Sequence, residues 1–312
     1  MKLIITIPAY NEENTVAKVI EEIPKKIEGI SKIEILVIDD GSTDKTSEAA
    51  KKAGAQVLIN KKRLGLARTF KKGLENALNL GADIIINTDA DFQYNQKQIP
   101  LLIKPILNNE ADIVLGSRFK GWIEEMPLQK KIGNRIVSWI VRNISGLPIS
   151  DAQTGFRAFS REAALQLNIF SDYTYTQETI LQAAEKKLII REAPIDFRKR
   201  KGSSRLISNI FVYAKKAFLT ILIAYLNYKP LKVFLGIGSI FFLLGLLLGS
   251  RVLIHYFNTG LVSPYLPTAI LTAVLLIFGF QIIVIGLIAE MIKYNRKIEE
   301  ELLYKIKKMT WQ

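Results

Sequence analysis

The sequence predicts an α/β domain whose mostly parallel sheet is covered by helices on both faces, followed by amphipathic interfacial helices and two transmembrane helices. In the first half of the chain, short segments rich in Ile and Val alternate with segments of helical periodicity, which is the pattern of parallel sheets. Between Leu231 and Ala289 charged residues almost vanish, and they return afterwards. The 312 residues leave room for one α/β domain of about 200 residues and a separate membrane part.

Strand and helix candidates alternate ahead of residue 120. The expected strands are Leu3–Pro8, Ile33–Asp39, Gln56–Ile59, Asp83–Thr88 and Asp112–Gly116, and the expected helices lie near Glu13–Ile27, Asp44–Ala53, Leu66–Leu80 and Gln96–Leu107. Ligands of such sheets bind at the carboxyl ends of the strands, so we expect functional side chains directly after them.

Composition and missing motifs exclude or disfavour several kinds of site. The chain has no cysteine and a single histidine, His255, which excludes a disulfide framework, a thiolate or multi-histidine metal site and a Ser-His-Asp triad. No G-x-G-x-x-G follows the first strand and no G-x-x-x-x-G-K-[ST] occurs, which disfavours dinucleotide and P-loop sites. The net charge of +14 favours anionic partners such as nucleic acid, acidic lipid headgroups or phosphorylated substrates, although a thermophile-like lysine-rich surface also accounts for it.

Acidic side chains follow the fourth expected strand. Asp89 and Asp91 come directly after that strand, and Gln93 comes two residues after Asp91. Two carboxylates and an amide oxygen are hard ligands suited to Mg²⁺ or Mn²⁺. Such an ion bridges a diphosphate and stabilises the charge of a departing nucleotide. A D-x-D pair alone also fits turn or capping aspartates, but its place at a strand end favours a metal site.

Several motifs in a fixed order carry a family resemblance. The segments I-P-A-Y-N-E-E from Ile7, V-I-D-D-G-S-T-D-K-T from Val37, D-A-D-F-Q from Asp89 and G-S-R from Gly116 resemble glycosyltransferase family 2, of the GT-A fold. Over roughly residues 1–230 the chain is most similar to dolichyl-phosphate mannose synthases and related polyprenyl-phosphate sugar transferases. The resemblance implies a nucleotide site at Pro8, Ala9, Tyr10, Glu12, Asp39 and Asp40, with Asp40 reading the base, and a metal site at Asp89, Asp91 and Gln93.

Later motifs extend the resemblance to the acceptor side. Asp151–Phe156 resembles the family's acceptor loop, and Lys201–Leu206 resembles its basic motif, with Arg205 where lysine is usual and Lys130 where arginine is common. The expected catalytic residues are Asp91, Arg118 and Asp151. Asp151 either takes part in the reaction, by orienting or accepting a proton, or holds its own loop together. The candidates for gripping an acceptor phosphate are Arg118, Lys130, Arg135, Lys201 and Arg205, although each also fits an ordinary surface charge. The Q-x-x-R-W motif of processive polysaccharide synthases is absent, which disfavours a polymerase.

Two uncharged stretches are long enough to span a membrane. Val233–Ser250 and Leu266–Ala289 each reach the roughly 18–20 residues that a spanning helix needs, whereas two buried helices of a soluble core are the alternative. Positive residues flank the pair on its outer sides, so both chain ends are expected in the cytoplasm. The expected division is a cytoplasmic GT-A domain at 1–203, an interfacial amphipathic helix at 204–230, a two-helix transmembrane hairpin at 231–290 and a charged cytoplasmic tail at 291–312.

A second amphipathic segment is Leu128–Ser145. Leu128, Ile132, Ile136, Trp139 and Ile140 form an apolar stripe beside Lys130, Lys131, Arg135 and Arg142. The segment either lies on the membrane surface or packs as an ordinary helix on its own domain.

These observations predict an inverting, metal-dependent glycosyltransferase. The expected reaction is transfer of a sugar from a nucleotide sugar to a polyprenyl or dolichyl phosphate, and the resemblance implies GDP-mannose as the first expectation for the donor. UDP-glucose and UDP-N-acetylglucosamine are alternative donors, a glycan or protein is an alternative acceptor, and a scaffold with a degenerate transferase domain is a further alternative. The partners are a nucleotide sugar, a lipid phosphate and membrane lipids, and no nucleic acid is expected.

Overall fold

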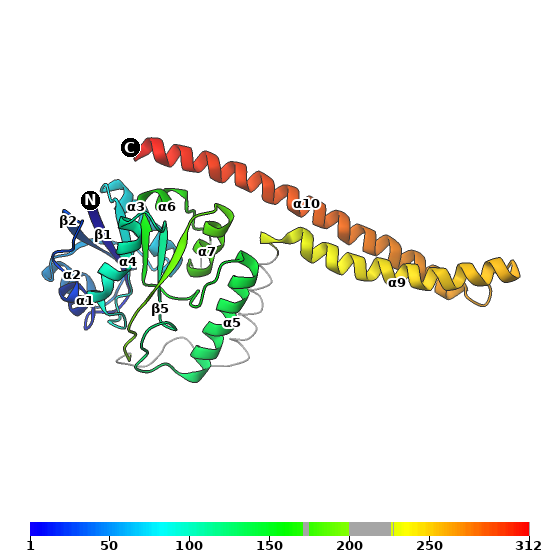
Figure 1. Cartoon of the computed structure of the whole chain (residues 1–312), viewed down its shortest axis with the longest axis horizontal. Coiled ribbons are helices and arrows are strands. Elements are labelled where there is room, and N and C mark those ends of the chain that lie inside the picture. The colour runs from blue at the N-terminus through cyan, green and yellow to red at the C-terminus, as the bar shows by residue number, and fades with distance from the viewer. Residues whose placement is uncertain (171–174, 200–225, 227, 312) are drawn as a thin grey trace. The chain divides into compact units, whose positions relative to one another are not determined.

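A computed structural model describes residues 1–170, 175–199, 226 and 228–311 (Figure 1). These residues belong to two compact units, one formed by Met1–Asn209 with Glu300–Gln312 and the other by Ile210–Glu299. The interfacial helix predicted at 204–230 falls almost wholly outside the described residues. Lys201 and Arg205 lie outside them as well.

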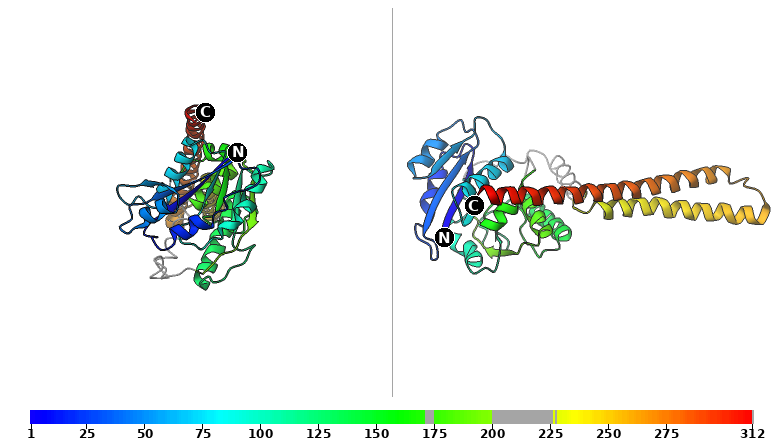
Figure 2. Two further views of the ribbon diagram at one scale, coloured as in Figure 1. Left: turned by 90° about the vertical axis from the view of Figure 1, so that its left-hand side faces the viewer. Right: turned by 90° about the horizontal axis from the view of Figure 1, so that it is seen from above.

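The first unit is built on a seven-stranded sheet in the order β3-β2-β1-β4-β6-β5-β7. Two further views of the ribbon show helices packed against this sheet (Figure 2). The strands are β1 (Lys2–Ala9), β2 (Lys32–Asp39), β3 (Gln56–Ile59), β4 (Ile84–Asn87), β5 (Ile113–Ser117), β6 (Arg157–Ser160) and β7 (Ile190–Pro194). Only β6 runs antiparallel to its neighbours, β4 and β5. The mostly parallel sheet is therefore confirmed, and the five expected strands are all present; β6 and β7 were not anticipated.

Helices connect the strands and cover both faces of the sheet. They are α1 (Val16–Glu22), α2 (Thr46–Lys52), α3 (Leu66–Asn79), the 3₁₀ turn η1 (Gln96–Gln98), α4 (Ile99–Leu107), α5 (Leu128–Ser145), α6 (Arg161–Gln166) and α7 (Thr176–Glu185). Alternate residues of β1 point to opposite faces. Leu3, Ile5 and Ile7 pack in one core with α1 and α4. On the other face α3 approaches so closely that a Cβ at Gly73 would lie 2.9 Å from Ile38 Cδ1.

The second unit contains the two apolar helices. α9 spans Pro230–Thr259 and α10 spans Leu266–Thr310. In each helix only 11% of the most apolar 18-residue stretch is buried. An uncovered apolar helix pair fits lipid and not the core of a soluble domain. Glycines let the helices approach each other: a Cβ at Gly279 would lie 2.7 Å from the backbone N of Phe242, as is typical of helix packing in membranes.

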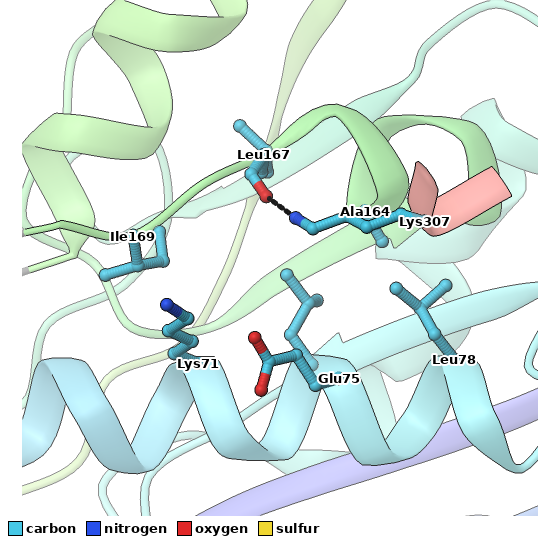
Figure 3. A pocket seen from close by; sticks show the side chains of 8 residues that line it. Lys71, Glu75, Leu78, Ala164, Leu167, Ile169 and Lys307 are labelled. Atoms are coloured by element: carbon cyan, nitrogen blue, oxygen red, sulfur yellow. Dashed lines mark hydrogen bonds between the residues drawn. The ribbon is translucent and has the colours of Figure 1, made fainter. Parts of the chain in front are cut away.

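The charged segment predicted at 291–312 lies almost wholly in α10, and its residues from Glu300 onward belong to the first compact unit. Lys307 donates to the carbonyl of Leu167 (2.8 Å) and to Asn168 Oδ1 (2.7 Å), and Glu300 pairs with Lys186 at 3.0 Å. Lys307 thereby closes a small pocket between α3 and α6 (Figure 3). Its lining contains none of the predicted site residues.

Candidate active site

The loops after β1 and β2 are tied to each other at the carboxyl edge of the sheet. Asn11, which has a left-handed φ of 54°, accepts from the Thr43 N–H at 2.8 Å, and its own N–H donates to Ser42 Oγ at 3.0 Å. The N–H of Glu12 donates to Thr46 Oγ1 at 2.8 Å. Pro8 and Ala9 are buried at the end of β1, whereas Tyr10 and Glu12 are partly exposed. The predicted nucleotide residues of the first loop therefore lie beside those of the second.

Asp39 and Asp40 both use their carboxylates to fold this edge. Asp39 accepts from the Ser42 N–H at 2.8 Å and from the Ser47 hydroxyl. Asp40 is 5% exposed and accepts from Asn60 Nδ2 (3.0 Å), Leu64 N (2.8 Å) and Gly65 N (2.9 Å). A carboxylate can accept about four hydrogen bonds, so most of the acceptor positions of Asp40 are occupied by the loop at 60–65. Base reading by Asp40 stays a prediction, and its visible task is to shape the loop ahead of α3.

The same loop carries a residue that sequence reasoning missed. The guanidinium carbon of Arg63 lies 4.2 Å from the ring centroid of Tyr10, within cation–π range. Arg63 ends the basic run Lys61-Lys62-Arg63. That basic run is the signal in the sequence that could have drawn attention to Arg63. Its contact with Tyr10 depends on the fold, because the two residues lie far apart in the chain.

The D-x-D-x-Q segment forms a constrained loop after β4. Phe92 has a left-handed φ of 61°, which is unusual for a bulky residue. The N–H of Gln93 donates to Asp91 Oδ1 at 3.2 Å, and the Gln93 side chain donates to the carbonyl of Arg198 at 3.1 Å. Asp89, Asp91 and Gln93 are all partly exposed, as ligands of an accessible ion must be. Strain of this kind is often found at functional sites.

Arg198 fixes the far side of this loop. Its backbone N–H donates to the Gln93 carbonyl at 2.8 Å, and its guanidinium pairs with Glu22 at 2.6 Å. Burial raises the pKa of Glu22, but hydrogen bonds from Arg198 and from the Gln96 N–H outweigh it, so the pKa lies below its usual value. The chain that leaves β7 therefore crosses the predicted metal loop before it enters the basic K-G-S-S-R segment.

The acceptor-side loop touches the predicted metal ligands through Gly155. The Gly155 N–H donates to the Tyr94 hydroxyl at 2.9 Å, and the Gly155 carbonyl accepts from Asn87 Nδ2 at 2.8 Å. The carboxylate of Asp89 packs directly on this glycine. Burial, and then the charge of Asp89, raise the pKa of Tyr94 well above its ordinary value, so the hydroxyl stays protonated.

Arg118 and Asp151, predicted as catalytic residues, form a buried bidentate ion pair. Arg118 Nε lies 2.7 Å from Asp151 Oδ2 and Arg118 Nη2 lies 2.8 Å from Oδ1, and the Arg118 backbone N–H also donates to Asp151. Burial lowers the pKa of Arg118, but the hydrogen bonds and charge of Asp151 outweigh it and raise that pKa above the usual value. The geometry favours Asp151 as the group that holds Arg118 and the loop, and not as a proton acceptor.

A fully buried arginine organises the same loop. Arg157 donates to the carbonyls of Ala152 (3.0 Å), Thr154 (2.8 Å) and Thr176 (2.7 Å) and to Thr179 Oγ1 (2.6 Å). Burial lowers the pKa of Arg157 to about 10. Backbone carbonyls thus accept most of the hydrogen bonds of the Arg157 guanidinium. The same hydrogen bonds hold residues 152–154 in place.

The remaining predicted cations lie on α5 or beyond the described residues. Lys130 is partly exposed, and Arg135 is exposed with its guanidinium carbon 5.7 Å from the Phe119 ring centroid. Lys201 and Arg205 lie outside the described ranges. Among the residues that are described, no group of three or more His, Cys, Asp or Glu side chains is placed to hold a metal.

Family models match both parts of the chain. Residues 4–167 match the model for glycosyl transferase family 2, and residues 229–293 match the model of the GtrB C-terminal hairpin. Together with the mostly parallel sheet and the loops described above, this match defines a glycosyltransferase. The chain belongs to glycosyl transferase family 2.

Relatives support the same assignment. A UDP-N-acetylglucosamine–dolichyl-phosphate N-acetylglucosaminyltransferase of Methanococcus voltae is 33% identical over 61% of this chain and 83% of its own length. A dolichyl-phosphate hexose transferase of Haloferax volcanii is 28% identical over 65% of this chain and 86% of its own length. Glucosyl-3-phosphoglycerate synthase of Mycobacterium tuberculosis, solved with Mn²⁺, UDP-glucose and phosphoglyceric acid, shares the fold with a TM-score of 0.56 and 22% identity over 72% of this chain and 79% of that one.

Proposed function

We propose that this glycosyltransferase transfers a sugar from a nucleotide sugar to a polyprenyl or dolichyl phosphate at the cytoplasmic membrane surface. The observation that carries the proposal is the meeting of three elements at one sheet edge: the nucleotide loops after β1 and β2, the acidic loop after β4 and the loop at 151–156. The dolichyl-phosphate relatives and the two apolar helices support a lipid acceptor. GDP-mannose remains our first expectation for the donor, with UDP-glucose and UDP-N-acetylglucosamine as the alternatives.

The residues present fit a divalent cation. Asp89 and Asp91 supply hard oxygen ligands from one loop, and a glycine stands where any side chain would push into Asp89. Mg²⁺ and Mn²⁺ use few protein carboxylates and fill other positions with water and substrate phosphates, so two carboxylates suffice. When bound, such an ion would neutralise the charge of the departing nucleoside diphosphate.

The proposed reaction is a single inverting displacement. An oxygen of the lipid phosphate attacks the anomeric carbon, and the bond from that carbon to the diphosphate oxygen breaks, which releases the nucleoside diphosphate. A phosphate monoester is largely ionised near neutral pH, with a second pKa of about 6, so no strong general base is needed. Arg118, held by Asp151, and the basic residues Lys130, Arg135, Lys201 and Arg205 are proposed to neutralise and position the acceptor phosphate.

Helix α5 presents a surface suited to the membrane. Ile140 of the predicted stripe is buried with Val141 and Ile144, so the stripe was wrong at that residue. Its other four members, Leu128, Ile132, Ile136 and Trp139, are exposed. Leu128 is 71% exposed and Trp139 is 60% exposed. Exposed apolar side chains beside basic ones favour the interface of an anionic bilayer, where tryptophan is common. We propose that this stripe inserts among lipid headgroups, where a lipid phosphate is found.

The stripe can be tested through its tryptophan. In a protein that carries Trp122→Phe and Trp311→Phe, Trp139 is the remaining tryptophan, since the chain has three. We expect brominated lipids to quench Trp139 in vesicles and Ile132→Glu together with Ile136→Glu to abolish that quenching. Leu101→Glu, at an exposed apolar residue of α4, is the matched control and should leave it unchanged. Trp139 emission that aqueous iodide quenches and brominated lipid does not would contradict membrane contact.

The donor and the metal can be tested together. Purified full-length protein is offered labelled GDP-mannose, UDP-glucose and UDP-N-acetylglucosamine with a polyprenyl phosphate. We expect one donor to label the lipid, EDTA to remove the activity, and Mn²⁺ or Mg²⁺ to restore it. Undiminished transfer in excess EDTA would overturn the metal site, and no transfer from any nucleotide sugar would overturn the proposed function.

A further inference from the structure

Gly155 is anchored on both sides against the predicted metal loop. Its N–H is bound by the Tyr94 hydroxyl at 2.9 Å and its carbonyl by the Asn87 amide at 2.8 Å. Tyr94 is only 2% exposed and Asn87 is fully buried. Asn87 is the last residue of β4, so one anchor is part of the sheet itself. The peptide groups of Gly155 therefore cannot shift without breaking buried hydrogen bonds.

The carboxylate of Asp89 occupies the space that a side chain at position 155 would need. A Cβ on Gly155 would lie 2.7 Å from Asp89 Oδ1 and 2.9 Å from Oδ2. Gly155 is not among the residues with a left-handed φ, so an alanine could adopt its backbone conformation. The position requires the absence of a side chain and not the flexibility of glycine.

We infer that Gly155, held by Tyr94 and Asn87, is a positioning residue that sets where the Asp89 carboxylate lies in the metal site. This inference rests on the proposed metal-dependent transfer and deepens it. An added Cβ at 155 requires either the Asp89 carboxylate or the Gly155 backbone to move, and buried hydrogen bonds hold the Gly155 backbone on both sides. An alanine at 155 therefore displaces the carboxylate and leaves the fold in place.

A purely structural role makes a different prediction. Gly73 is also buried, and a Cβ there would lie 2.9 Å from Ile38 Cδ1. Gly73→Ala therefore introduces a comparable close contact away from the acidic loop. If Gly155 serves packing alone, Gly155→Ala and Gly73→Ala should change thermal stability and leave metal binding equal.

The test is a titration of full-length protein in detergent with Mn²⁺, followed by electron paramagnetic resonance in the presence of UDP or GDP. We expect Gly155→Ala to weaken Mn²⁺ binding about 10- to 100-fold, as removal of a group that orients a metal ligand does. Tyr94→Phe, which removes the acceptor of the Gly155 N–H, should weaken it in the same direction. Gly73→Ala should bind Mn²⁺ like the wild type.

Each outcome decides a separate question. Wild-type affinity in both Gly155→Ala and Tyr94→Phe would overturn the positioning role and leave the proposed function standing. If Gly155→Ala does not fold, Tyr94→Phe alone decides. If the wild-type protein itself binds no Mn²⁺ with either nucleotide, the metal-dependent function fails and the inference fails with it.

Discussion

Asp91→Ala is expected to abolish sugar transfer while the protein stays folded. Asp91 is partly exposed on the loop after β4 and is one of the two carboxylates proposed to hold the cation. The charge stabilisation that a cation gives a leaving diphosphate is worth several kcal/mol, so its loss should slow transfer about a thousandfold or more. The measurement is initial-rate transfer of labelled sugar to polyprenyl phosphate, with the thermal midpoint recorded on the same sample.

A matched control lies at the other end of the same strand. Asp83 comes directly before β4 and accepts from the Lys2 N–H at 2.7 Å, far along the strand from the acidic loop. Asp83→Ala removes a carboxylate with a structural hydrogen bond and should retain transfer. Retained transfer in Asp91→Ala would show that the metal site has been misplaced.

Asp151→Ala is expected to destabilise the catalytic unit strongly. Asp151 is fully buried and makes the bidentate pair that compensates the guanidinium of Arg118, itself 7% exposed. Removal of one partner leaves a buried charge uncompensated, which typically costs about 3–5 kcal/mol. We expect a large fall in the thermal unfolding midpoint together with loss of transfer.

An exposed ion pair provides the comparison. Glu125 pairs with Lys199, and the two side chains are 56% and 60% exposed. Glu125→Ala should leave the midpoint close to that of the wild type, because solvent screens such pairs. A midpoint for Asp151→Ala equal to that of Glu125→Ala would show that the Arg118–Asp151 pair does not hold this region together.

The parallel part of the fold could be predicted because its pattern is local. β1 to β5 agree with the expected strands within a residue or two, and α5 spans the expected Leu128–Ser145. β6 was missed because it has four residues and contains Arg157, a charge that reads as solvent-exposed. Its guanidinium is satisfied by carbonyls of two separate segments, and such long-range contacts leave no periodic signal.

The candidate site residues follow from motif order, whereas the partners of their side chains depend on the fold. Motif order singled out Asp40, which follows β2, and Asp151, which pairs with Arg118 just after β5. Their partners, the Leu64 and Gly65 amides and Arg118, come from distant segments. Those contacts show that both carboxylates shape loops, and the roles predicted for them in ligand binding and proton transfer stay predictions. The helical end of α10 on the catalytic unit has the same explanation, since the sequence shows only a charged tail.

The most direct test of the central claim is a competition between acceptors. Purified full-length protein receives its labelled nucleotide sugar together with polyprenyl phosphate, a free sugar and a peptide in one reaction. We predict that the label enters the lipid-phosphate fraction and that nucleoside diphosphate is released in equal amount. Label in the sugar or the peptide, with the polyprenyl phosphate left unmodified, would contradict it.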